Sequence, residues 1–187
     1  MRSLLSSDCV WVEQHDYYER QSYRNRCNIA AANGVMSLSV PVERVQGEKS
    51  VTKDIRISDH ANWRHVHWQS IVSAYNMSPF FEYYEDDIAP FFHKKWDFLL
   101  DFNVEILHKI LELLEIEKEI KLTSQYDVIL PQKVVDLRRE FHPKSQRVVN
   151  GKDYYQVFVE KHGFLPDLSV MDLLFNMGNE SILYLTD

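Results

Sequence analysis

The sequence contains little glycine and little cysteine. Only five glycines occur in 187 residues, and neither a GxGxxG nor a GxxxxGK[ST] pattern is present. Such patterns hold the phosphates of dinucleotides and nucleoside triphosphates, so the sequence gives no sign of either kind of site. The two cysteines, Cys9 and Cys27, form no CxxC pair and have no histidine at a spacing typical of zinc. We therefore expect no metal, no cofactor and a reduced, cytoplasmic protein.

Long apolar runs and an excess of positive charge are also absent. No stretch approaches the ~18 uninterrupted apolar residues of a transmembrane helix, and the N-terminal MRSLLSSDCVW lacks the apolar core of a signal peptide. A formal net charge of -7 argues against a nucleic-acid-binding protein, which is usually basic over a whole face. It leaves room for a small anionic ligand, because a local basic pocket is sufficient for one. The length and a hydrophobic content of 45% favour one domain over residues 1–187.

The first third of the chain favours β-strands. Residues 9–13 (CVWVE) are β-branched and aromatic, which predicts a buried strand. Asn33-Gly34 lies between two apolar runs and predicts a β-hairpin with strands near 24–32 and 35–42, because a type I′ turn needs positive φ at both central residues. The alternating residues 53–58 (KDIRIS) predict another strand.

From residue 59 the apolar period becomes helical. Apolar residues and one histidine recur on a single face, at Trp63, His67, Ile71 and Ala74. Ser78-Pro79 predicts the start of a new helix, and Pro90 predicts the opening of a further segment. Residues 98–116 carry a wide apolar face and predict the main core helix, and residues 119–123 (EIKLT) predict a strand.

The last third begins with a polar, irregular stretch over residues 124–152, which predicts a long surface excursion or a lid. Residues 153–164 predict a helix that ends at Gly163. Residues 165–178 predict a shorter helix, capped by Asp167 or Ser169 and ended by Gly178.

These elements together predict the α/β class. We expect a mixed β-sheet, built from residues 9–58 and a strand near 120, that contains a β-hairpin and is packed by several helices. The alternative is an α+β arrangement, with the strands and the helices segregated.

A concentration of arginine at residues 20–26 (RQSYRNR) is the first candidate site. In an extended chain Arg20, Arg24 and Arg26 would point to one side, because strand side chains alternate. The guanidinium fork suits phosphate or carboxylate, and the neighbouring tyrosine and amides can add neutral hydrogen bonds. The alternative is that these arginines pair with surface carboxylates such as those of residues 82–87 (EYYEDD).

His67 is the second candidate, because it lies on the apolar stripe between Trp63 and Trp68. An imidazole beside aromatic rings can have a pKa suited to general acid or base catalysis, whereas the alternative is a structural histidine. Cys27 follows Arg26, which could activate a thiol, but a small buried residue is favoured at a strand position. Ser78 and Phe80 could border a pocket.

Several motifs together resemble the WbqC-like family. SYRNRCNI, NG and LSVPVE are followed by DIRIS, by NWRHVHWQSIVSAYNMSPFFEYY and by FNVEILHKILELLEI. Family members show an N-R pair before a strand, a hairpin ending in T/S-V-P-V, and a W-x-x-x-H-W helix leading to an aromatic segment. In this chain the motifs fall on Asn25 and Arg26, Ser39 to Val42, Trp63, His67 and Trp68, and Tyr75, Pro79, Phe80 and Phe81. The resemblance covers most of residues 8–126, and the closing PDLSVMDLLFNMG resembles a Bacteroidetes-type branch of the family.

The resemblance implies a bacterial protein associated with surface-polysaccharide (O-antigen) gene clusters, and transfer of an amino or acyl group onto an anionic sugar derivative such as a nucleotide sugar. On this basis we expect Arg24 and Arg26 to hold phosphates or a carboxylate and Asn25 to orient the substrate. Ser78 would border the pocket, and His67 would act as general acid or base. The alternative is a non-catalytic binding or assembly protein that docks an acidic partner through the same arginines.

The N-terminus departs from the family pattern. Family members usually carry a strand and an H-Q-P-x-Y-x-P motif before the segment that matches Asp8, and the residues before Asp8 in this sequence do not contain it. We therefore expect the sheet to lack one strand. The open edge could pair with another chain, as in a homo-oligomer.

Overall fold

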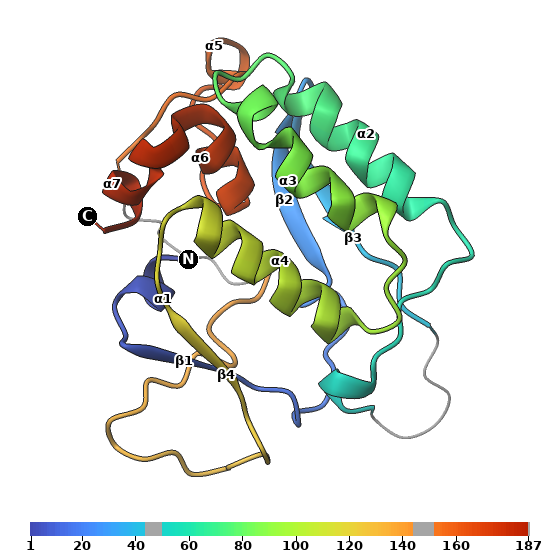
Figure 1. The fold of residues 1–187 in the computed structure, drawn as a ribbon, viewed down its shortest axis with the longest axis vertical. Helices are drawn as coiled ribbons and strands as arrows, with labels where there is room; N and C mark the ends of the chain where they lie inside the picture. Colours follow the sequence, from blue (N-terminus) through green and yellow to red (C-terminus); the bar gives the residue numbers. More distant parts are fainter. Residues whose placement is uncertain (44–49, 144–151, 187) are drawn as a thin grey trace.

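The computed structural model describes residues 1–43, 50–143 and 152–186. The polar residues 44–52 also predict a loop, and most of it lies outside the described residues, as does the end of the excursion predicted at 124–152. The predicted fold class is confirmed, because helices pack on small parallel and antiparallel sheets. In Figure 1 the helices α2, α3 and α4 form a layer in front of the hairpin strands β2 and β3, and the C-terminal helices lie at one side of this layer.

The strands pair as two separate sheets rather than joining in one. Strand β1 (Cys9–Val12) pairs in parallel with β4 (Glu119–Leu122), and strand β2 (Arg26–Ala31) pairs antiparallel with β3 (Gly34–Ser39). Parallel strands need a long connection between them. Here the hairpin and the three long helices all lie within that connection.

The hairpin turn lies one residue earlier than predicted. Ala31 pairs with Gly34, so the loop consists of Ala32 and Asn33. Positive φ occurs at Gly34 (105°) and not at Asn33. The conformation that an L side chain avoids is therefore adopted by the glycine alone, as the first residue of β3.

The strand predicted at residues 53–58 is wrong. Thr52–Asp54 form a single 3₁₀ turn, η1, and beyond it Arg56 and Ile57 make only isolated bridges, to Phe98 and Val42. The backbone of this stretch bonds to the connection before α4, where Ile57 N donates to Asp97 O at 3.0 Å and Leu99 N donates to Ile55 O at 2.9 Å. The alternation of apolar and polar residues at 53–58 therefore reflects an irregular segment with one buried face, which places Ile55 and Ile57 in the core.

The three long helices are α2 (Trp63–Tyr75), α3 (Phe81–His93) and α4 (Leu99–Leu113). Ser78 does not cap α3, because its hydroxyl donates to Tyr75 O at 2.7 Å and closes the end of α2 instead. Pro90 lies inside α3 and does not open a new segment. The ring is exposed and the helix ends at His93, so the lost N–H costs only one bond near the helix end.

Short helices complete the fold near both ends of the described chain. They are α1 (Arg2–Leu5), α5 (Val159–His162), α6 (Val170–Met177), the 3₁₀ turn η2 (Gly178–Glu180) and α7 (Ser181–Thr186). Only the last turn of the helix predicted at 153–164 forms, and Gly163 ends it with a φ of 69°. Ser169 caps α6, and Gly178 ends it, as predicted.

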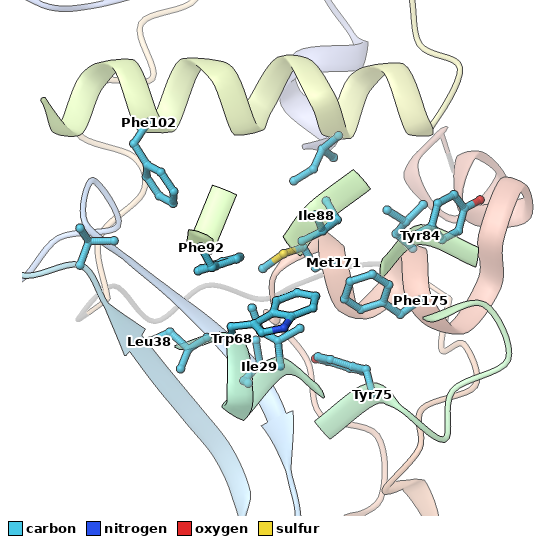
Figure 2. Packing of buried hydrophobic residues seen from close by; sticks show 14 of the residues in the cluster. Ile29, Leu38, Trp68, Tyr75, Tyr84, Ile88, Phe92, Phe102, Met171 and Phe175 are labelled. Atoms are coloured by element: carbon cyan, nitrogen blue, oxygen red, sulfur yellow. The ribbon is translucent and has the colours of Figure 1, made fainter. Parts of the chain in front are cut away.

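One hydrophobic core joins the hairpin to the helices (Figure 2). The hairpin contributes Ile29 and Leu38, and α6 contributes Met171 and Phe175. Aromatic rings of α2, α3 and α4 lie between them, where Trp68 stacks on Phe92 with ring centroids 5.9 Å apart. Strand β2 is thus fixed on its inner face by helices distant in sequence.

A buried carboxylate ties β2 to the C-terminal part of the chain. Asp172 has no exposed surface and accepts hydrogen bonds from Tyr75 Oη (2.8 Å), Tyr154 Oη (2.6 Å) and Gln156 Nε2 (3.1 Å). The Tyr75 hydroxyl also accepts the backbone N–H of Ala30, at 3.1 Å. Burial raises the pKa of Asp172, and the three donors oppose the rise.

The excursion after β4 lies against the start of the chain. Residues 124–143 form no helix or strand, and most of their side chains are exposed. Arg138 Nη1 lies 3.6 Å from Glu13 Oε2, and the guanidinium lies over the ring of Tyr126. Glu13 also accepts from Thr123 Oγ1 at 2.9 Å, next to the end of β4. A lid role for this excursion stays a prediction.

Candidate anion-binding site

An open hollow of about 260 Å³ lies where the RQSYRNR segment leads into β2. Its lining residues come from two parts of the chain, namely Tyr18, Arg20, Gln21, Asn25 and Arg26 with Val42 and Glu43. We call it the arginine hollow. Two guanidinium groups against one carboxylate make it locally basic on an acidic chain.

Asn25 extends the hairpin by one step beyond the strands. Its backbone carbonyl accepts from Val40 N at 2.8 Å, and its side-chain Nδ2 donates to Val40 O at 3.0 Å. The side-chain amide thus replaces a backbone donor. With Nδ2 used in this way, the remaining polar atom is Oδ1, which is buried and has no hydrogen-bond partner among the described residues.

Arg26 is the first residue of β2 and pairs with Ser39 across the hairpin. Its Nε is buried and also lacks a hydrogen-bond partner within the described part of the chain. Buried polar atoms without partners are uncommon in proteins. Here a donor and an acceptor of this kind belong to adjacent residues that both line the arginine hollow.

Arg24 does not line the arginine hollow. Its guanidinium forms a short ion pair with Asp16 and lies 3.6 Å from Glu19 Oε2. Its carbonyl accepts from Asn103 Nδ2 of α4 at 2.7 Å. These contacts anchor the segment that leads into Asn25, which suits a positioning role. The prediction that Arg24 itself contacts an anion stays a prediction.

The three arginines all influence the ionisation of the Tyr18 phenol. The segment is turned rather than extended, with a φ of 57° at Gln21, and Arg20 lies at the arginine hollow. Burial raises the pKa of Tyr18, and Arg24, Arg20 and Arg26 oppose the rise. All three guanidinium groups therefore lie within electrostatic range of one phenol.

His67 lies inside the core and not among the residues that line the arginine hollow. Its ring makes edge contacts with Trp63 and Phe92, at centroid distances of 5.1 and 6.4 Å. Burial lowers the pKa of His67 to about 4, against a hydrogen bond to the backbone of Ser39. Its ring is therefore neutral at pH 7. This geometry favours a structural role, and the role of His67 as general acid or base stays a prediction.

Ser78 and Cys27 are also placed away from the arginine hollow. Ser78 is buried at the end of α2, and its hydroxyl is used by Tyr75 O. Burial raises the pKa of Cys27 to about 11, against a hydrogen bond involving Ser169. The thiol therefore stays protonated at neutral pH, as expected of a small core residue and not of a nucleophile.

The chain is similar to known protein sequences over most of its length. The profile described as the WbqC-like protein family matches residues 1–155. The chain belongs to the WbqC-like protein family. This WbqC-like chain is also 25% identical, over 196 residues, to the uncharacterised protein Rv1507c of Mycobacterium tuberculosis. That match covers 90% of this chain and 83% of the relative. No solved structure matches the chain.

The WbqC-like fold brings together residues that sequence reasoning had left apart. Tyr18, Gln21, Val42 and Glu43 were not predicted as site residues, and Arg20 was not among the arginines expected to hold the ligand. The chain near Tyr18 is held by residues 50–52, where Tyr18 N donates to Ser50 O at 2.9 Å. No local sequence pattern predicts such pairing between irregular segments that are distant in sequence.

Residues 1–43, 50–143 and 152–186 contain no group of three or more His, Cys, Asp or Glu side chains that could hold a metal ion. Among the helices of the same residues, none has the length and apolar character needed to span a membrane.

Proposed function

We propose that this WbqC-like protein binds an anionic sugar derivative in the arginine hollow, as the substrate of a transfer reaction in surface-polysaccharide metabolism. The observation that carries the proposal is that Arg26 and Asn25, which line the basic hollow, each carry a buried atom without a hydrogen-bond partner among the described residues, Nε and Oδ1 respectively. Arg26 would donate to a phosphate or carboxylate oxygen, and Asn25 would accept from a hydroxyl. Sugar phosphates and uronic acids carry both groups.

The remaining lining residues suit the same ligand class. Tyr18 and Gln21 can donate to or accept from hydroxyls, and Glu43 can accept from a hydroxyl of a sugar but would repel a second anionic group. A hollow of about 260 Å³ corresponds to roughly nine water molecules at ~30 Å³ each, so it fits the charged part of a monosaccharide derivative. The rest of a nucleotide sugar would extend from it into solvent.

Isothermal titration calorimetry tests the binding step. The panel is inorganic phosphate, a monosaccharide 1-phosphate, a uronic acid, the neutral parent sugar and a nucleotide sugar. We expect the charged sugars to bind and the neutral sugar not to bind. Arg26→Gln should weaken binding at least tenfold, since a hydrogen bond to a charged group contributes about 1.5–3 kcal/mol. Arg64→Gln is the matched control, because Arg64, on α2, pairs with Asp59 and does not line the arginine hollow.

Two results would overturn the proposal. One is that no charged sugar binds, and the other is that Arg26→Gln and Asn25→Ala both bind as the unmodified protein does. Co-purification of an acidic protein, lost in Arg26→Gln while no small anion binds, would instead establish the docking alternative.

The assignment of catalysis to His67 is tested separately once a bound sugar is known. If His67 transfers a proton, His67→Gln keeps the affinity for the sugar and loses turnover. If His67 is structural, the same variant lowers the thermal stability and leaves turnover per folded molecule unchanged.

A further inference from the structure

A second open hollow, also of about 260 Å³, lies where α3 begins beside the end of α6. Its lining residues come from the two helix ends and η2, namely Phe80, Tyr83, Tyr84 and Met177 with Asn179 and Glu180. We call it the tyrosine hollow. In Figure 1 α6 and the start of α3 lie in the upper part of the view, away from the start of β2.

Two tyrosine rings form a corner of the tyrosine hollow. Tyr83 and Tyr84 lie edge to face, with ring centroids 4.8 Å apart and planes at 88°. Tyr83 is 76% exposed, whereas Tyr84 is buried and its hydroxyl donates to Asn179 Oδ1 at 3.0 Å. The Tyr84 ring is therefore held in place, and the Tyr83 ring beside it faces the solvent.

Phe80 supplies a third ring, which is held against a glycine. The backbone N–H of Phe80 donates to Phe175 O at 3.0 Å, joining it to α6. A Cβ at Gly178 would lie 2.8 Å from Phe80 Cδ1, and the φ of 57° is one that L side chains rarely adopt. Only glycine lets this ring lie across the backbone at the end of α6.

Carboxylates give the tyrosine hollow a negative charge. Glu180 is one of its lining residues, and Glu115 Oε1 accepts from Asn179 Nδ2 at 3.3 Å. Burial raises the pKa of Tyr84, and Tyr83 and Glu115 add to the rise. Over the described ranges neither Glu115 nor Glu180 has an ion-pair partner. The carboxylates therefore remain available to a cation brought by a ligand.

We propose that the tyrosine hollow binds an alkylated ammonium group, of the trimethylammonium type. Aromatic faces attract cations, and a quaternary ammonium loses little hydration when rings surround it. Its methyl groups would contact Phe80, Tyr83 and Met177, while the charge would face Glu180. A neutral apolar ligand would gain nothing from the carboxylates, and a metal ion would gain little from the rings.

The proposal does not depend on the arginine hollow or on the activity of the family. Met177, Asn179 and Glu180 lie after residue 155, where the match to the family profile ends. The tyrosine hollow therefore combines the family domain with residues beyond the matched part of this chain.

Calorimetric or NMR titration with choline and with its neutral isostere 3,3-dimethylbutan-1-ol tests the proposal. We expect choline and tetramethylammonium to bind and the isostere to bind at least tenfold more weakly. Tyr83→Ala and Glu180→Gln should each weaken choline binding at least fivefold. Both positions are exposed, so the variants should fold normally, which circular dichroism checks. Tyr155→Ala and Glu160→Gln are matched controls at exposed sites outside the hollow and should bind choline normally.

Titrations with a trimethyl-lysine peptide and with phosphatidylcholine vesicles separate the sources of the ammonium group. The probe that binds most tightly shows which of these sources the hollow prefers, and binding of any of them supports the shared chemistry if Tyr83→Ala weakens it. Equal affinity for choline and the isostere would overturn the proposal in favour of an apolar pocket. Absence of ammonium binding, or choline binding that neither variant at Tyr83 or Glu180 changes, would also overturn it.

Discussion

The hydroxyl of Tyr75 donates to Asp172 Oδ1 at 2.8 Å, across 97 positions of the sequence. The hydroxyl oxygen of Tyr75 also accepts the backbone N–H of Ala30. The Tyr75 side chain therefore joins α2, α6 and β2. Strand β2 begins with Arg26, so this buried network holds in place the strand that carries the arginine proposed to bind an anion.

Tyr75→Phe should therefore lower the free energy of unfolding by about 1–3 kcal/mol, since it leaves Ala30 N without a partner and removes one donor from Asp172. Urea unfolding followed by circular dichroism measures the loss. Ser73→Ala, at an exposed position of the same helix, is the control and should change the stability by less than about 0.5 kcal/mol. An unchanged stability for Tyr75→Phe would show that water replaces the hydroxyl.

Protonation of His67 should destabilise the fold in mild acid. Its pKa is about 4 in the folded protein and near 6.5 when unfolded, so between these values the unfolded chain binds more protons. The contribution of the neutral, buried His67 ring to the free energy of unfolding is fully present above about pH 6.5 and is lost as the pH falls towards about 4. It amounts to about 3 kcal/mol over that window.

Urea unfolding of the unmodified protein and of His67→Gln at pH 7 and pH 4.5 measures this effect. The variant should lose less stability on acidification than the unmodified protein. Asp172 acts in the opposite direction, because its raised pKa favours the folded state as the pH falls towards 3.8. Identical pH dependence in the two proteins would contradict the burial argument for His67.

Gly178→Ala should destabilise the protein and disturb the tyrosine hollow. The added Cβ would lie 2.8 Å from the Phe80 ring, and the alanine would also have to adopt an unfavourable positive φ. Gly163→Ala is the matched control, because Gly163 has a φ of 69° and nothing within 4 Å of the added atom. We expect both variants to lose about 1–2 kcal/mol through backbone strain, and Gly178→Ala to lose more. Thermal unfolding of both measures the difference, and equal losses would mean that Phe80 moves aside without cost.

Much of the fold could be predicted because the signals were local. The periodic apolar face of α4, the Asn33-Gly34 pair and the stop at Gly178 each depend on a few neighbouring residues. The errors lie where tertiary contacts decide. Residues 55–57 bond to the connection before α4 instead of forming a strand, and the hydroxyl of Ser78 closes α2 instead of capping α3.

Among the residues that line the arginine hollow, only neighbours within one short segment were predicted from the sequence. Asn25 and Arg26 belong to one short segment, and both line the arginine hollow. Val42 and Glu43, which come from a different segment, also line it, whereas Arg24, whose guanidinium pairs with Asp16, does not. The Asp172 network escaped prediction because an aspartate in an apolar helix gives no indication of which hydroxyls will reach it.

The Asp16–Arg24 ion pair gives a test that separates positioning from direct binding. Asp16→Asn removes the ion pair but keeps an oxygen for the hydroxyl of Thr52. If Arg24 only positions the segment, anionic sugars should bind about threefold to tenfold more weakly despite the added positive charge. If Arg24 contacts the ligand, its release should strengthen binding instead. Calorimetry at two salt concentrations measures the change and shows whether it is electrostatic.

The parallel pairing of β1 with β4 has a consequence for synthesis. Cys9 pairs with Glu119, so 110 residues must be translated after the first strand before its partner exists. At a rate of ~5–20 residues per second, β1 leaves the ribosome roughly 5–20 s before it can form its sheet. The hairpin of β2 and β3 has no such delay, because its strands are separated by only two residues. Trp11 of β1, which pairs with Lys121, therefore has no partner strand beside it during that interval.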